Sequence, residues 1–384
     1  MTIAEILSNE ELRRREFPVA AGKIFLGHAG VCPLPRRVAD AMTDCATKST
    51  LGDQEEFMLN RLAEARKLGA SLLQCQPEEI ALVGPTSLAL SLVSSGLKFR
   101  RGDNILIYHD DYPSNVYPWM ALAEKNVEVR LLNTRGLGVI RPRDVVGQID
   151  ENTKFVALAS CHFISGFRLE VAEIGKLLRE RNILFCLDAI QTLGAFPTTV
   201  EHVDFLAADA HKWLLGPCGA GLFYVRRELQ EKLNPPIYGW HNIRNPNFVA
   251  QETIEYKNDA RKFEAGTHNL IGLTGLIASM EIALEIGVEN IATELLRKRA
   301  WLLPELQKFG FTVLNANEKP ENAGSILSFF HPDKEMSARH KKLADAGIVT
   351  SLRTDRTGKN YIRISPHFYN TDAELQRVLE ILSS

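Results

Sequence analysis

The stretch Asp209-Ala210-His211-Lys212-Trp213 decides how this chain is interpreted. It follows an apolar run that ends near Ala207 and has the composition of a β-strand. A lysine held among apolar residues behind a strand has a depressed pKa, which favours the neutral amine needed to form a Schiff base. A surface lysine is the alternative. The glycine-rich run 216–221 is interpreted as a turn into another strand, because it lacks the following helix of a nucleotide-binding loop.

Outward from this stretch, apolar runs alternate with helix-like segments. Runs that are apolar on both faces and separated by helices predict a mostly parallel sheet covered by helices. Open sheets of this kind bind ligands at the carboxyl ends of their strands. The expected strands are 80–83, 104–108, 127–131, 155–159, 184–187, 205–207 and 220–225, and the expected helices are 87–97, 119–125, 172–181 and 272–286.

The pattern changes near Glu289. Helix, strand (311–314), strand (325–330), helix, strand (361–364) and helix follow in order and predict a small α+β unit. We therefore expect an α/β protein with a large domain at 21–288 and a small C-terminal domain at 289–384. Residues 1–20 are expected to pack with the small domain.

The composition excludes several classes of protein. The 384 residues are 45% hydrophobic and 24% charged, as in ordinary globular proteins. The net charge of −2 makes nucleic acid or an anionic membrane an unlikely partner. No signal peptide or membrane span is recognisable. The six cysteines form no C-x-x-C pair, so we expect a reduced, cytoplasmic protein with no metal site.

Two further polar segments stand at predicted strand ends. Thr86 and Ser87 open a helix directly after a strand and offer hydroxyls beside free backbone N–H groups, which suits a phosphate; a plain helix cap is the alternative. Asp188 follows the apolar run 183–187 and must face a polar partner, such as a protonated pyridine nitrogen, or lose solvation energy. Gln191 could then reach a phenolic oxygen on the same ring. A helix cap is again the alternative for Asp188.

These segments, together with Glu264-Ala265-Gly266-Thr267, resemble the class V aminotransferase family of fold-type I enzymes that use pyridoxal 5′-phosphate (PLP). That family includes cysteine desulfurases, selenocysteine lyases and isopenicillin N epimerase. The resemblance covers nearly the whole chain. It implies a homodimer with shared active sites and an amino-acid substrate. It makes Lys212 the lysine that binds PLP, Asp188 the partner of the pyridine nitrogen and Gln191 the partner of the phenolic oxygen. It also places His211 beside the cofactor, Thr86 and Ser87 at its phosphate, and Thr267 at the phosphate of the partner subunit.

The resemblance suggests further contacts. Tyr112 stands where family members place a ring over PLP, often a histidine. Arg363 resembles the arginine that grips the substrate carboxylate, and Arg353 is a second candidate. His28 and His162 are candidate substrate contacts, with packing roles as alternatives. His241 could come near the partner's site.

Two departures from the family pattern narrow the expected reaction. The segment 354–360 is short and lacks the cysteine on which desulfurases form a persulfide. Asp209 stands where desulfurases usually have serine, and its charge would repel a phosphate unless it points elsewhere. We expect C–S or related β-elimination from an amino acid. Transamination and epimerisation are alternatives, and a non-catalytic PLP-binding protein is an alternative of a different class.

Overall fold

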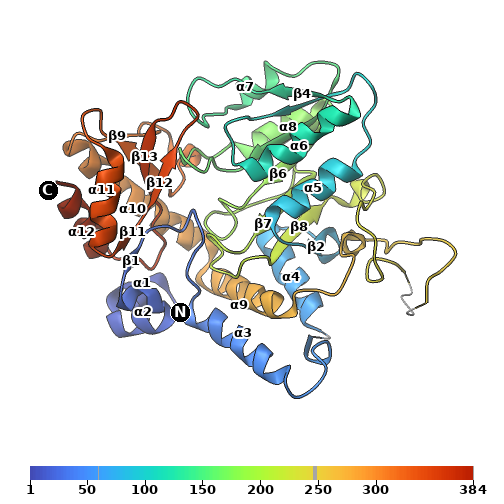
Figure 1. Cartoon of the computed structure of the whole chain (residues 1–384), viewed down its shortest axis with the longest axis horizontal. Coiled ribbons are helices and arrows are strands. Elements are labelled where there is room, and N and C mark those ends of the chain that lie inside the picture. The colour runs from blue at the N-terminus through green and yellow to red at the C-terminus, as the bar shows by residue number, and fades with distance from the viewer. Residues whose placement is uncertain (59, 245–248, 384) are drawn as a thin grey trace.

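A seven-stranded sheet forms the centre of the molecule in a computed structural model that describes residues 1–58, 60–244 and 249–383 (Figure 1). Its strand order is β2-β8-β7-β6-β5-β3-β4, and only β8 runs antiparallel to its neighbours. The carboxyl ends of the other six strands therefore share one edge. The strands are β2 Ile80–Leu82, β3 Asn104–Ile107, β4 Glu128–Leu131, β5 Thr153–Ala159, β6 Leu184–Asp188, β7 Phe205–Asp209 and β8 Gly221–Val225.

Alternate residues of each strand point to opposite faces of the sheet, so both faces carry apolar side chains. Helices cover both faces and bury these side chains. Leu206 and Leu222 belong to a core shared with α4, α8 and α9, whereas Phe205 and Phe223 belong to a core shared with α5 and α6. The sequence prediction of an α/β fold with a covered, mostly parallel sheet is confirmed. The helices of this part are α3 Arg36–Lys48, α4 Arg61–Leu73, α5 Thr86–Gly96, α6 Tyr117–Met120, α7 Pro142–Val146, α8 Val171–Glu180 and α9 Leu270–Ile286.

The C-terminal part is a four-stranded antiparallel sheet with helices on it (Figure 1). Its strand order is β12-β13-β10-β9. A separate strand pair joins β1 to β11 in parallel and draws the N-terminal segment to this part. The elements are α1 Ile3–Ser8, α2 Glu10–Glu16, β1 Ile24–Phe25, α10 Val288–Lys308, β9 Thr312–Val313, β10 Leu327–Phe330, α11 Met336–Asp345, β11 Ile348–Val349, β12 Ser351–Thr354, β13 Asn360–Ile364 and α12 Asp372–Ser383.

The N-terminal helices are held by a buried ion pair and an aromatic stack. Arg13 pairs with Glu374 at 2.8 Å, and the rings of Phe17 and Tyr369 are stacked with centroids 4.2 Å apart. The first residues therefore contact the C-terminal residues directly.

One predicted helix has a different form in the structure. The stretch 119–125 was expected to form a single helix, but α6 ends at Met120 and a 3₁₀-helix spans Ala121–Lys125. Asn126 closes it in the left-handed conformation (φ 61°), which stops the chain from continuing as a helix.

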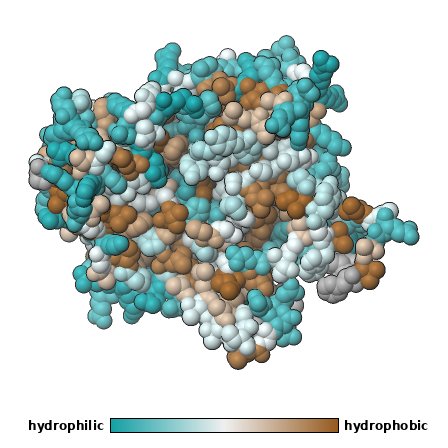
Figure 2. All heavy atoms as spheres, in the orientation of Figure 1, coloured by the Kyte–Doolittle hydropathy of each residue, from teal (hydrophilic) through white to brown (hydrophobic). Residues whose placement is uncertain are grey.

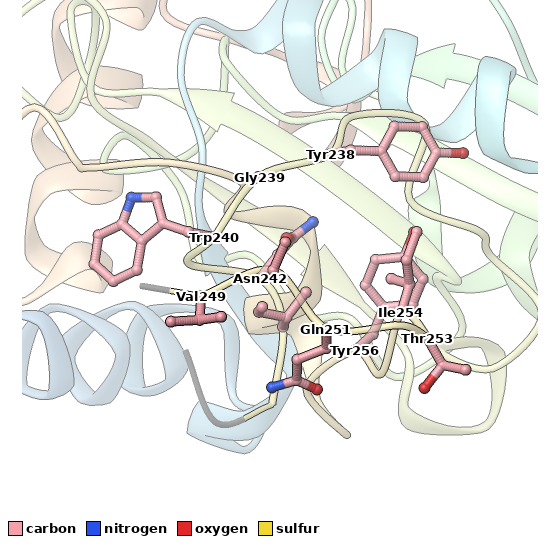
Figure 3. Close-up of a pocket in the computed structure, with 11 residues that line it drawn as sticks. Tyr238, Gly239, Trp240, Asn242, Val249, Gln251, Thr253, Ile254 and Tyr256 are labelled. Carbon is pink, nitrogen blue, oxygen red and sulfur yellow. The ribbon is translucent and has the colours of Figure 1, made fainter. Parts of the chain in front are cut away.

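The described residues 237–244 and 249–256 belong to an arm beyond the sheet, at the right of Figure 1. Its apolar side chains surround a cavity of about 480 Å³, and Figure 3 shows Tyr238, Trp240, Val249, Ile254 and Tyr256 around it. Tyr238 and Val249 are 68% and 69% exposed. Figure 2 shows apolar side chains on the arm and over the middle of the same face. Among the described helices, none is long and apolar enough to cross a membrane alone; α9 and α10 pass that test only as a pair, bent by 76°.

Candidate active site

Lys212 lies three residues beyond the end of β7 and is only 7% exposed. Its Nζ lies 5.1 Å from the centroid of the Tyr112 ring. Burial lowers the pKa of Lys212 to about 8, although the charge of Asp188 acts in the opposite direction. The amine is therefore much closer to its neutral, nucleophilic form at neutral pH than an exposed lysine would be.

Asp188 ends β6, the strand beside β7, and is buried. Its Oδ1 accepts a hydrogen bond of 3.0 Å from the N–H of Ile190. Burial raises the pKa of Asp188, and the positive charges of Lys212 and His211 oppose that rise. A buried carboxyl group facing a lysine is the arrangement expected where a cationic ring is to be bound between them.

A second buried acid, Asp111, lies close to Asp188 and was missed by the sequence analysis. Its oxygens accept hydrogen bonds from the N–H groups of Tyr112 (2.7 Å) and Ala159 (3.2 Å) and from the amide of Asn115 (3.0 Å). Burial and the negative charge of Asp188 raise the pKa of Asp111 to about 7. The signal was present, since Asp111 is also an acid just after an apolar strand.

Gln191 is fixed by hydrogen bonds on both ends of its amide. Its Oε1 accepts from Trp213 Nε1 at 2.8 Å, and its Nε2 donates to the carbonyl of Ala29 at 3.1 Å. An amide nitrogen has two hydrogens, so one remains for a ligand. Trp213 follows Lys212 directly, and this bond therefore ties Gln191 to the lysine loop.

Thr86 and Ser87 form the first turn of α5, at the same sheet edge as Lys212. The Thr86 hydroxyl accepts a hydrogen bond of 2.9 Å from the N–H of Asp209. The Asp209 carboxylate accepts from the N–H groups of Ala210 (2.7 Å) and Gly219 (3.1 Å) and lies 3.1 Å from Nδ1 of His211. Asp209, which stands where desulfurases usually have serine, thus holds the lysine loop together and positions His211.

Arg363 is buried on β13, where its Nη1 donates to the carbonyl of Phe163 at 2.6 Å. The Phe163 ring lies edge-on to Tyr112, with centroids 5.3 Å apart, and so connects this arginine to the ring beside Lys212. Arg363 Nε is buried and has no hydrogen-bond partner among the described residues. Arg353 lies on the neighbouring strand β12. Besides burial, the positive charge of Arg353 lowers the pKa of both Lys212 and Arg363.

The segment 354–360 is the tight turn between β12 and β13. Asp355 accepts hydrogen bonds from Thr357 and from the Tyr361 hydroxyl at 2.8 Å. Arg356 then reaches across to the loop after β3, where it pairs with Asp110 and donates to the carbonyl of His109 at 2.9 Å. This short turn therefore bridges the two parts of the chain beside the candidate site.

The structure places two predicted substrate contacts, His28 and His162, in hydrogen bonds within the protein. His28 is fully buried, and its ring nitrogens bind the Ser365 carbonyl (2.9 Å) and the Tyr369 hydroxyl (2.7 Å). His162 is buried with its nitrogens on Ser165 Oγ (3.0 Å) and the Asp110 carbonyl (2.9 Å). Both ring nitrogens of each imidazole have partners within the protein, as the packing alternative predicts.

Thr267 is exposed and lines a cleft together with Gly84, Leu88 and Gly219. Nearby, His241, Glu264 and His268 place ligand atoms within 4.8 Å of one another, as a metal site would. However, Glu264 is buried and already pairs with Arg66 at 2.5 Å and with His268 at 3.0 Å. This cluster is an ion-pair network that anchors the loop carrying Thr267.

The chain matches the family model "Aminotransferase class-V" over residues 24–378. The chain belongs to the class V aminotransferase family. It is 29% identical to a probable cysteine desulfurase of Methanothermobacter thermautotrophicus, covering 96% of both chains, and 27% identical to one of Pyrococcus abyssi, again covering 96% of both.

Solved structures agree with this assignment. The apo cysteine desulfurase of Thermococcus onnurineus has a TM-score of 0.89, 25% identity and 96% coverage of both chains. A C-DES variant with glycine covalently linked to its PLP cofactor has a TM-score of 0.88 and 21% identity, covering 97% of this chain and 99% of that one. This class V aminotransferase is thus a PLP-dependent enzyme of fold type I, a lyase or a transferase.

The residues at the sheet edge fit PLP. A buried amine of lowered pKa, a buried carboxyl group, an aromatic ring and a helix N-terminus bearing hydroxyls match its aldehyde, pyridine nitrogen, ring face and phosphate.

Proposed function

We propose that this class V aminotransferase family member is a lyase that removes a sulfur-containing or related group from the β-carbon of an amino acid. The observation that carries the proposal is that Lys212 and Asp188, at the carboxyl edge of the central sheet, lie near Arg363 of the C-terminal sheet, beside a turn without cysteine. Transamination and epimerisation remain the second candidate, because they use the same groups and differ only in where the α-carbon is reprotonated.

The cofactor is held by groups of this chain. Lys212 binds it covalently, Asp188 keeps its pyridine nitrogen protonated, Gln191 meets its phenolic oxygen and Tyr112 packs on its ring. Thr86, Ser87 and the N–H groups at the start of α5 bind its phosphate. When bound, PLP supplies an electron-poor ring that stabilises negative charge at the α-carbon of an amino acid.

The remaining steps are carried out by side chains. Arg363 forms a bidentate pair with the α-carboxylate of the substrate and fixes its orientation. As a free amine, Lys212 Nζ would remove the α-proton of the bound substrate, because its pKa of about 8 gives a usable neutral fraction. His211, oriented by Asp209, assists proton transfer at the lysine.

The turn at 354–360 favours release of sulfur without capture by the enzyme. It has no cysteine, and its contacts with Asp110 and His109 hold it in place. All six cysteines are free thiols, and we therefore also propose that the enzyme works in a reducing compartment, the cytoplasm.

We further propose a homodimer in which residues 237–244 and 249–256 of the arm contact a second copy. Exposed aromatic and aliphatic side chains on a protruding segment are typical of an interface. Thr267, anchored by the Glu264 network, would then meet the phosphate held by the other subunit. Size-exclusion chromatography with light scattering tests the dimer.

The central experiment is borohydride reduction of the holoenzyme followed by peptide mass spectrometry. The PLP mass should appear on Lys212 and be lost in Lys212→Ala. Lys262→Ala is the matched control, because Lys262 is also buried with a lowered pKa but bonds to the Gln230 carbonyl. A tag on another lysine would refute the assignment.

The reaction type is tested with a panel of amino acids and sulfur-containing analogues, assayed for pyruvate, sulfide, keto acid and inverted stereocentre. If the visible band of the bound cofactor forms but no amino acid perturbs it, the protein is instead a non-catalytic PLP binder.

A further inference from the structure

Arg353 and Arg363 lie on one face of the sheet beside Lys212. In the antiparallel pair β12–β13, Ser351 stands opposite Arg363 and Arg353 stands opposite Tyr361. Arg353 is therefore the diagonal neighbour of Arg363, and such residues have Cα atoms about 7–8 Å apart on the same face. The hydrogen bond from Arg363 Nη2 to Ser351 Oγ (3.4 Å) shows the Arg363 side chain running along this face.

The two arginines lack acidic partners within the described residues, whereas Arg356, in the turn between their strands, pairs with Asp110. Neither forms an ion pair with a described residue. Arg353 Nη1 donates a hydrogen bond to the Leu352 carbonyl (2.9 Å), and Arg363 Nη1 donates one to the Phe163 carbonyl.

The nearby acids are already engaged. Asp110 pairs with Arg356, and Asp355 accepts bonds from its own turn and from Tyr361. Asp188 and Asp111 lie by Lys212 and form no ion pair with either arginine. Two guanidinium groups without an ion-pair partner among the described residues are suited to bind anions from outside.

A single α-carboxylate neutralises the charge of only one of them. Arg363 is the more buried, leads through Phe163 to Tyr112 and is the partner proposed above for the α-carboxylate. Arg353 is half-buried. Along the chain it is nearer than Arg363 to the turn in which Arg356 pairs with Asp110. We propose that Arg353 binds a second anionic group, so that the substrate is an amino acid whose side chain carries a carboxylate or sulfinate. This inference rests on the proposed function of the site.

The test uses acids without an amine, which bind the arginines but cannot react with the cofactor. Succinate and butyrate are titrated into the holoenzyme by isothermal calorimetry. Succinate should bind about 10- to 100-fold more tightly than butyrate, as expected for charged hydrogen bonds to a second carboxylate. Arg353→Gln should reduce succinate to the affinity of butyrate and change butyrate less than about twofold.

Three variants complete the design. Arg363→Gln should weaken both acids, and Arg353→Lys should keep part of the preference, because it retains the charge but loses the planar fork. Arg377→Gln is the matched control: it removes an exposed arginine, paired with Glu380, and should change neither affinity.

Equal affinities in the wild type, binding of neither acid, or equal weakening of both acids by Arg353→Gln would overturn the inference. The last result would mean that both arginines grip one carboxylate. Failure of the proposed function is detected separately, by loss of the PLP tag on Lys212 or by a cofactor band that no amino acid shifts.

Discussion

The titration of Lys212 gives a quantitative test of the site. At pH about 7.5, a lysine with a pKa of about 8 is neutral in roughly 24% of molecules, whereas one with the ordinary value near 10.5 is neutral in roughly 0.1%. Burial thus raises the reactive fraction by about 200-fold. Because the neutral amine is the reactive form, attachment of PLP should accelerate with rising pH and level off above the pKa.

The assay follows the visible absorption band as PLP binds to apoenzyme between about pH 6 and pH 10. The rate at each pH is divided by the rate with a free model amine, which cancels ionisation of the cofactor itself. The midpoint should lie near pH 8. Asp188→Asn should move it to lower pH, because the negative charge of Asp188 helps Lys212 to keep its proton. A wild-type midpoint above pH 10, or a shift to higher pH in the variant, would contradict this reasoning.

Other changes test individual contacts. Arg363→Ala should weaken amino-acid binding about 10- to 100-fold with PLP content unchanged, measured by spectral titration; unchanged affinity would end the carboxylate assignment. Asp209→Asn places an N–H against buried loop amides and should lower the free energy of unfolding by about 1–3 kcal/mol in urea titrations; no change would argue against its role in the loop. Glu264→Gln breaks a buried ion pair with Arg66 and should lower the free energy of unfolding by about 3–5 kcal/mol. The pKa of Glu264 is about 2, below its ordinary 4.5. The difference in free energy of unfolding between wild type and variant should therefore be largest above pH 4.5 and shrink as the pH falls toward 2. A constant difference over that range would refute the pairing.

The sheet and the lysine were predictable because their signals are local. Apolar runs separated by helices predict a parallel sheet, and a polar residue just after such a run lies at the carboxyl edge. Lys212 and Asp188 were predicted in this way and do lie buried at that edge, and Asp111 follows from the same rule.

The histidines were not predictable because their roles depend on distant parts of the chain. Whether the ring nitrogens of His28 are free is decided by Ser365 and Tyr369, more than 330 residues away. For His162 the deciding partner is the carbonyl of Asp110, which the sequence does not distinguish from any other carbonyl.

The segment at 24–32 has a practical consequence. Its strand β1 pairs with β11, and His28 binds the carbonyl of Ser365 in the C-terminal part. The carbonyl of Ala29 accepts a hydrogen bond from Gln191, and the N–H of Cys32 donates to the carbonyl of His211 at 2.8 Å. Shortened versions of the chain made for crystallisation should therefore start before residue 24. A later start would remove the contacts to Gln191 and to the carbonyl of His211, the residue before Lys212. Such a protein should bind less PLP even with every residue proposed to touch the cofactor intact.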